Sequence, residues 1–95
     1  MKVEFLEQAF IEFQDAIDFY RMQSEGLEKK FVSEVDKTIS IINNFPESFL
    51  EYTNHTRKAV VSIFPYNIIY SIVNKTIIVI ALAHQHRKPD YWIKK

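Results

Sequence analysis

Hydrophobic residues in the first half of the chain recur at intervals of three and four positions, the spacing of one face of an α-helix. The first stripe lies within residues 7–20 and consists of Ala9, Phe10, Phe13, Ala16, Ile17 and Tyr20. The second consists of Leu27, Phe31, Val35, Ile39, Ile42 and Phe45. Gly26, the only glycine, separates the stripes, and Pro46 ends the second. The pattern predicts a hairpin of two amphipathic helices.

The pattern changes near residue 56 to the alternating and continuous apolar runs that are typical of β-strands. Three strands are expected, at residues 57–64, 66–73 and 76–84, with a tight turn at Asn74-Lys75 between the last two. Residues 47–56 are predicted to form a polar connection, and residues 3–6 a further short strand. The run at 76–84 is apolar on both faces, which predicts a central or doubly covered strand.

The order β-α-α-β-β-β predicts an α+β fold in which the two-helix hairpin packs on an antiparallel sheet. With 95 residues and no repeat or linker, residues 1–95 are expected to form one domain. The absence of cysteine excludes disulfides and thiolate chemistry and fits a reducing compartment. The acidic start is unlike a signal peptide, and the longest apolar run, residues 77–83, is too short to span a bilayer. We therefore expect a cytoplasmic protein without a membrane partner.

The net charge of zero conceals an asymmetry between the two parts of the chain. Residues 1–54 contain eleven acidic and five basic residues, whereas residues 55–95 contain one acidic and seven basic residues. The net charges are therefore −6 and +6. This division is compatible with two interpretations: acids that simply favour the helical half, or a basic surface that binds an acidic partner.

The basic charge is concentrated beyond the last expected strand, together with aromatic residues. Arg87, Lys88, Tyr91 and Trp92 are residue types that are enriched at binding hot spots. They could form a target-binding surface, or their rings could pin the chain end onto the fold. Arg57 and Lys58 are adjacent in an expected strand and so project to opposite faces of the sheet. Both are candidates for target binding, against the alternative of edge solubility and ion pairing.

Two histidines, His84 and His86, stand two positions apart at the end of the last expected strand. An imidazole with a pKa near neutrality suits acid–base catalysis, although a histidine here can equally serve to end a strand by hydrogen bonding. A zinc site is not expected, because the chain has no cysteine and His55 is the only other imidazole. Neither a metal nor any other cofactor is predicted.

The helical hairpin is followed by Thr56-Arg57-Lys58, then by Phe64-Pro65-Tyr66-x-Ile68-x-Tyr70, and after an apolar strand by His84-x-x-Arg87-x-Pro89-x-Tyr91-Trp92. In this order and spacing the sequence resembles, over essentially its whole length, the RelE/ParE superfamily of bacterial type II toxins. The resemblance implies a chromosomal or plasmid-stabilisation toxin–antitoxin module. In such an addiction module, a small cognate antitoxin wraps the toxin and neutralises it.

The superfamily contains two mechanisms. RelE-like members cut messenger RNA on the ribosome, and their pattern has arginines at the positions of Asn67 and Gln85 and a tyrosine at that of Tyr91. Loss of two cations would remove stabilisation of the charged transition state. The resemblance is therefore closer to the ParE branch, some members of which inhibit DNA gyrase and are not enzymes.

Two alternatives stay open beside a ParE-like gyrase inhibitor. One is a RelE-like ribosome-dependent endoribonuclease that acts on mRNA with His84, His86, Arg87 and Tyr91 as its catalytic residues. The other is a family member that has kept antitoxin binding alone. Ile11 and Met22 project away from the first helical stripe, and we expect antitoxin or a second copy of the chain to cover them. A homodimer and a toxin–antitoxin heterotetramer are both possible assemblies.

Overall fold

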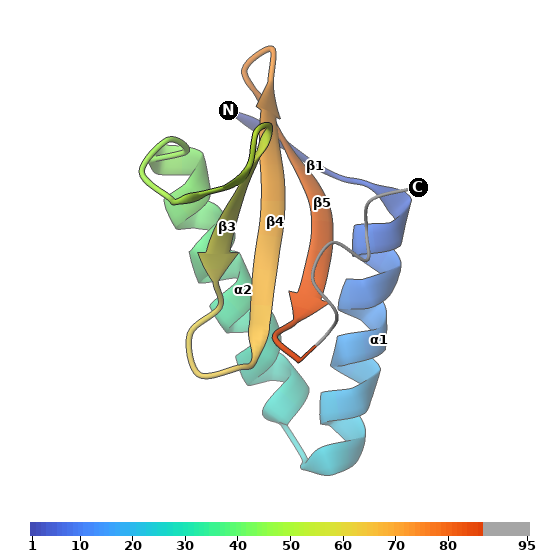
Figure 1. Ribbon diagram of the computed structural model, residues 1–95. Helices are drawn as coiled ribbons and strands as arrows, with labels where there is room; N and C mark the ends of the chain where they lie inside the picture. The colour runs from blue at the N-terminus through green and yellow to red at the C-terminus, as the bar shows by residue number, and fades with distance from the viewer. Residues whose placement is uncertain (87–95) are drawn as a thin grey trace.

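The computed structural model describes residues 1–86, and residues 87–95 lie outside the described part of the chain. Two helices, α1 (Glu7–Gln23) and α2 (Leu27–Asn44), pack as one layer against a five-stranded sheet (Figure 1). The strands are β1 (Lys2–Phe5), β2 (Glu51–Thr53), β3 (Thr56–Val60), β4 (Tyr66–Val73) and β5 (Thr76–His84). The α+β class is confirmed, and the described part adds one strand, β2, within the connection expected to be irregular.

The strand order across the sheet is β1-β5-β4-β3-β2. The pairs β2–β3, β3–β4 and β4–β5 are antiparallel, whereas β1 runs parallel to β5, so the sheet is mixed rather than wholly antiparallel. After β1 the chain passes through both helices and then through the antiparallel meander β2-β3-β4-β5, the last strand of which lies beside β1. Strand β5 is interior, as its apolar sequence predicts, while β4 is the middle strand of the five.

The helices bury most of their predicted stripes against the sheet. The buried helical residues are Ala9, Ala16, Tyr20, Phe31, Val35, Thr38 and Ile42. Two members of the predicted stripes are instead exposed, Phe10 by 50% and Phe45 by 63%. Phe10 follows buried Ala9 and is turned about 100° from it around the helix axis. Phe45 caps α2 with φ −138°, so helical spacing no longer fixes the direction of its side chain.

An aromatic cluster joins the helices to the sheet. The Tyr20 ring of α1 lies 5.0 Å from that of Phe31 of α2 and 4.9 Å from that of Phe64, which precedes β4. Phe31 also lies 5.1 Å from Phe64 and 5.4 Å from Tyr66. Most of these pairs meet edge to face, the arrangement that aromatic quadrupoles favour. The four rings fix both helices and the β3–β4 loop in one place.

The predicted strand 57–64 ends early, at Val60, because the next residues must turn. Val61 and Phe64 are both in the core, yet residues three apart in a strand point to opposite faces. The chain solves this conflict at Ile63, which adopts φ 59°. This left-handed conformation costs a residue with a side chain about 1–2 kcal/mol. The buried contacts of Phe64 therefore hold a strained residue in the loop.

The apolar run of β5 is buried on both faces of the sheet and contains a bulge. Tyr70 pairs with Val79 and Ile69 pairs with Ala81, which leaves Ile80 as the extra residue. Ile77 and Val79 belong to the core on the helical side, whereas Ala81 is buried without belonging to that core. Ile80 itself is only half-buried.

The position of the bulge predicts that Ile77 and Ile80, two isoleucines of the same strand, contribute differently to the free energy of unfolding. Ile77→Ala should lower the free energy of unfolding by about 2–5 kcal/mol, because it empties a fully packed site. Ile80→Ala removes the same atoms from a half-buried site and should cost less than half as much. Urea unfolding of both variants measures the difference. Equal losses would show that Ile80 belongs to the core and that the bulge lies elsewhere.

Candidate functional site

Four of the candidate target-binding residues, Arg87, Lys88, Tyr91 and Trp92, lie outside the described residues. The target-binding role expected of them stays a prediction. The other candidates lie at two ends of the sheet and along α1. Arg57 and Lys58 are in β3, and His84 ends β5 and precedes His86.

Arg57 lies on the helical face of the sheet, where it pairs across the ladder with Tyr70. Its Nη1 donates hydrogen bonds to the carbonyl oxygens of Glu47, at 3.2 Å, and Phe49, at 2.7 Å. Its Nη2 also lies 3.7 Å from Glu51 Oε1. The guanidinium thus ties the connection after α2 to the sheet. Its charge-assisted donors are directed at the protein's own acceptors.

Lys58 lies on the opposite face, as the alternation of a strand predicts, and pairs with Ile69. Its Nζ lies 4.8 Å from the centre of the Tyr52 ring, a distance suited to a cation–π interaction. Arg57 and Lys58 are therefore separated by the sheet and do not form one basic cluster.

His84 and His86 are brought together, with ring centroids 5.2 Å apart. The backbone N–H of His86 donates to His84 Nδ1 at 3.1 Å, which closes the turn after β5. The His84 ring meets that of Tyr66 edge to face at 5.1 Å. These contacts agree with a histidine that ends a strand by hydrogen bonding, and a catalytic role for His84 and His86 stays a prediction.

A pocket of about 210 Å³ adjoins His84 between α1 and β5. It is lined by Glu12, Asp15, Ala16, Phe19, Tyr66, Leu82 and His84. Glu12 Oε1 accepts a hydrogen bond from the backbone N–H of Leu82 at 3.1 Å. Two carboxylates therefore stand beside the histidine, and their charge opposes the approach of an RNA phosphate.

Tyr66 in this pocket is not suited to act as a phenolate base. Burial raises the pKa of Tyr66 above its ordinary value of 10.0. The nearby Tyr20, Glu12 and Asp15 raise this pKa further, because negative charge disfavours the phenolate. The ring stays neutral throughout the physiological range of pH.

The two positions that carry arginines in the ribonuclease pattern, Asn67 and Gln85, lie at the same end of the sheet. Asn67 pairs laterally with Val60 and Ala83. Gln85 directly follows β5, and its backbone N–H donates to the carbonyl oxygen of Pro65 at 2.8 Å. Both side chains are neutral, so neither can supply the cation that a charged transition state requires.

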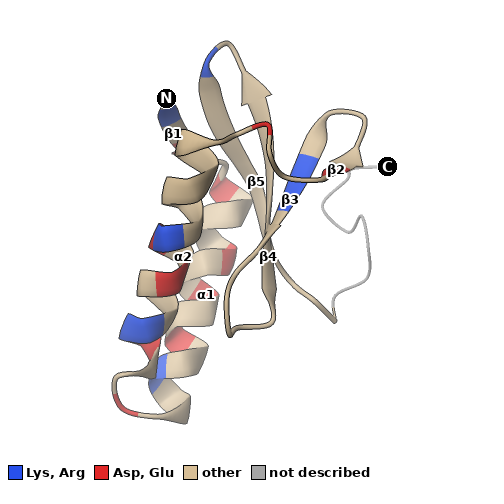
Figure 2. Ribbon diagram, turned by 90° about the vertical axis from the view of Figure 1, so that its left-hand side faces the viewer, with Lys and Arg blue, Asp and Glu red and all other residues tan. Residues whose placement is uncertain are grey.

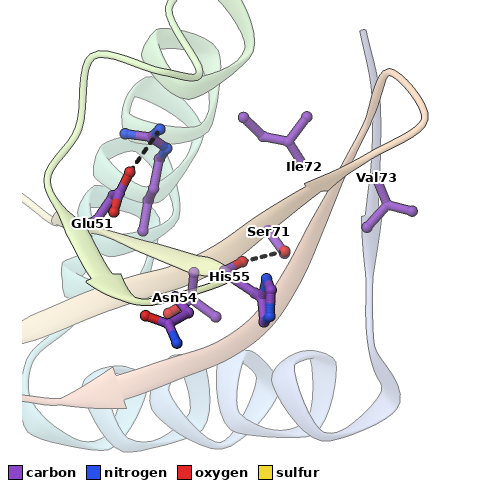
Figure 3. Close-up of a pocket in the computed structure, with 8 residues that line it drawn as sticks. Glu51, Asn54, His55, Ser71, Ile72 and Val73 are labelled. Atoms are coloured by element: carbon purple, nitrogen blue, oxygen red, sulfur yellow. Dashed lines mark hydrogen bonds and ion pairs between the residues drawn. The ribbon is translucent and has the colours of Figure 1, made fainter.

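Figure 3 shows a second pocket, of about 400 Å³, at the opposite end of β4. It is lined by Glu51, Asn54, His55, Thr56, Arg57, Ser71, Ile72 and Val73. Ser71 Oγ donates to the carbonyl oxygen of His55, and Glu51 pairs with Arg57. Sequence reasoning missed this pocket, because only the tertiary fold brings the β2–β3 turn to the end of β4. Within residues 1–86, no group of three or more His, Cys, Asp or Glu side chains could hold a metal ion.

The expected antitoxin-binding residues, Ile11 and Met22, are exposed on α1 by 46% and 85%. Ile11 lies in a shallow groove of about 480 Å³ lined by Glu7, Gln8, Ile11, Glu12 and Asp15. The structure adds Phe19, exposed by 53%, which sequence spacing did not single out. Figure 2 shows that most acidic residues, together with several basic ones, lie on the helical layer and that few charged residues lie on the sheet. Apolar and acidic groups are thus combined on α1.

Comparison with solved structures shows that the fold is similar to that of a chain described as "Chromosomal ParDE TA system from P. aeruginosa". The TM-score is 0.73 at 15% sequence identity, covering 88% of this chain and 95% of the other, which establishes a shared fold. A search of curated proteins found no match. The family model described as "ParE toxin of type II toxin-antitoxin system, parDE" matches residues 3–89, and the chain belongs to this family.

Membership confirms the resemblance to the RelE/ParE superfamily and its closer relation to the ParE branch. A protein of a toxin–antitoxin system has an antitoxin as partner. Among residues 1–86, no helix is both long and apolar enough to cross a membrane.

The raised pKa values predict how stability depends on pH. Burial raises the pKa of Tyr20, Tyr66 and Tyr70 above 10.0, so the folded state favours the neutral phenols. Their contribution is complete below pH 10 and is lost as the pH rises through the folded pKa values. Melting temperatures measured between about pH 8 and pH 11 should fall at the alkaline end, and less steeply in Tyr66→Phe. An unchanged slope in that variant would contradict the role given to Tyr66.

Proposed function

We propose that this protein is the toxin of a type II toxin–antitoxin module, that it inhibits DNA gyrase by binding, and that a cognate antitoxin neutralises it. The observation that carries the choice against RNA cleavage is the neutrality of Asn67 and Gln85. The acidic pocket beside His84 supports the same choice, because Glu12 and Asp15 repel a polyanion. In this proposal the target surface includes Lys58, Arg87, Lys88, Tyr91 and Trp92.

Two assays on the purified protein test the target. Added to purified DNA gyrase with relaxed plasmid and ATP, it should inhibit supercoiling, because it acts on the enzyme itself. Added to translating ribosomes, it should leave the mRNA intact, because the site lacks the two cations. Cuts in the mRNA that disappear on His84→Ala would contradict the proposal and favour the ribonuclease. Absence of both activities, with antitoxin binding retained, would identify a member that only binds antitoxin.

The combination of exposed apolar and acidic groups on α1 supports this helix as the proposed antitoxin surface. Ile11 lies between Glu7, Glu12 and Asp15 in the shallow groove. A complementary antitoxin segment would present apolar side chains at helical or extended spacing with basic residues between them. Binding of such a segment also covers part of the exposed apolar area of the helix.

A matched pair of substitutions tests this surface. Ile11→Asp should weaken binding of the cognate antitoxin at least tenfold, because it removes the apolar contact from the groove and places a carboxylate where binding would bury it without water. Ile41→Asp makes the same change at a residue of α2 that is 51% exposed, and should leave affinity within about twofold. Isothermal titration measures both. Equal affinity for the two variants, with both folded, would remove α1 from the interface.

A further inference from the structure

The pocket of about 210 Å³ beside His84 has walls of two kinds. Glu12 and Asp15 of α1 contribute carboxylates, while Phe19 of α1 and Tyr66 of β4 contribute aromatic rings. Carboxylates bind a cation through its charge, and aromatic rings bind one through their negative faces. Neither lysine nor arginine is among the described residues that line the pocket. The combination is suited to a cationic side chain from another protein.

The aromatic walls of the pocket are held by the core. The ring of Phe19 meets that of Tyr20 edge to face at 5.2 Å, and Tyr20 belongs to the aromatic cluster. The ring of Tyr66 lies 5.4 Å from that of Phe31 and 5.1 Å from that of His84. Because these contacts hold both rings before a partner binds, little entropy of the protein is lost when a side chain enters.

The short length of β1 makes room for the pocket beside β5. Strand β1 accompanies β5 only from Thr76 to Val79, and beyond that point α1 lies next to β5 (Figure 1). Glu12 Oε1 accepts a hydrogen bond from the backbone N–H of Leu82 at 3.1 Å, which fixes this carboxylate at the pocket. Leu82 and Ala16, both buried, add apolar surface that suits the methylene groups of a long basic side chain.

The charge of Asp15 is available to a partner. Other acidic residues of the helices are paired within the chain: Asp18 and Glu28 lie 3.1 and 3.4 Å from nitrogens of Arg21. Within residues 1–86, Asp15 forms no ion pair. Burial raises the pKa of Tyr66, and the negative charges of both pocket carboxylates raise it further, so their field reaches the ring.

The pocket is continuous with the shallow groove that contains Ile11. Glu12 and Asp15 line both the groove and the pocket. A segment that covers Ile11 with an apolar side chain is therefore in position to direct a neighbouring side chain into the pocket. Arginine is the best match, because its guanidinium binds carboxylates through several donors and also stacks on aromatic rings.

We propose that the pocket lined by Glu12, Asp15, Phe19 and Tyr66 receives an arginine side chain of the antitoxin and so determines which antitoxin the protein accepts. This inference rests on the proposed antitoxin surface on α1 and adds its specificity-determining contact. A partner with an apolar residue at that position would bury the carboxylates without replacing their water, and would be rejected. The occupant is the antitoxin, and neither gyrase nor a second copy of the chain.

Two matched pairs of substitutions test the pocket in the intact protein. Asp15→Asn keeps the shape of the side chain without its charge, and should weaken binding of the cognate antitoxin at least tenfold. Asp36→Asn makes the same change at an exposed residue of α2, and should leave affinity within about twofold. Phe19→Leu, which removes the aromatic face, should weaken binding at least about threefold, and Phe45→Leu should not. Isothermal titration measures all four, and unchanged affinity in Asp15→Asn would overturn the proposal.

A double-mutant cycle identifies the side chain that enters the pocket. Each arginine and lysine of the cognate antitoxin is replaced in turn with alanine and titrated against the parent and against Asp15→Asn. One replacement should weaken binding to the parent at least tenfold and binding to Asp15→Asn less than about threefold, because the shared contact is already lost. If every replacement weakens binding to both proteins equally, the pocket holds no basic side chain of the antitoxin and the proposal is wrong.

The same variants separate this inference from the proposed function. If Ile11→Asp weakens antitoxin binding and Asp15→Asn does not, the antitoxin surface on α1 stands and only the pocket fails. If neither variant weakens binding, both fail. The inference is also overturned if Asp15→Asn keeps its antitoxin affinity but inhibits gyrase less or changes its oligomeric state, because the target or a second copy then occupies the pocket. The titrations do not involve gyrase, so their result does not depend on the choice of target.

Discussion

The edge-to-face packing of Tyr20, Phe31, Phe64 and Tyr66 is the contact on which the rest of the arrangement depends. It links the two helices, α1 and α2, to the β3–β4 loop and the start of β4, where Phe64 and Tyr66 lie more than thirty residues further along the chain than Phe31. Because Phe64 must enter this cluster, the chain turns early after β3 and presents Ile63 to solvent. Tyr66 also belongs to the cluster. Its partner across the ladder, His84, lines a pocket together with Glu12 and Asp15 of α1.

A second set of contacts is polar and ties the irregular connection after α2 to the sheet. Tyr70 Oη donates to the carbonyl oxygen of Pro46 at 2.6 Å, and Arg57 donates to that of Phe49. These bonds satisfy backbone acceptors that a surface connection would otherwise leave to water. They also direct the charge of Arg57 towards the fold, whereas Lys58 lies on the other face of the sheet beside Tyr52.

The charges around His84 and at residues 67 and 85 distinguish this chain from the ribonuclease pattern more clearly than the histidines do. His84 and His86 are adjacent, but acid–base groups alone do not stabilise a charged phosphorane. Neutral side chains stand at residues 67 and 85, and carboxylates of α1 line the pocket at His84. In the proposed function, gyrase is inhibited by binding and the antitoxin covers α1.

The sequence by itself determined the helices, the meander and the class of fold, because helical and strand periodicities are local properties of side-chain direction. It also determined the order of motifs that marks the ParE branch. Only the tertiary structure decided that β1 pairs in parallel with β5, that β2 forms, and that Phe10 is exposed. It alone decided the left-handed turn at Ile63 and the inward contacts of Arg57. These features depend on which distant segments meet in the core, and no local spacing of residues encodes that choice.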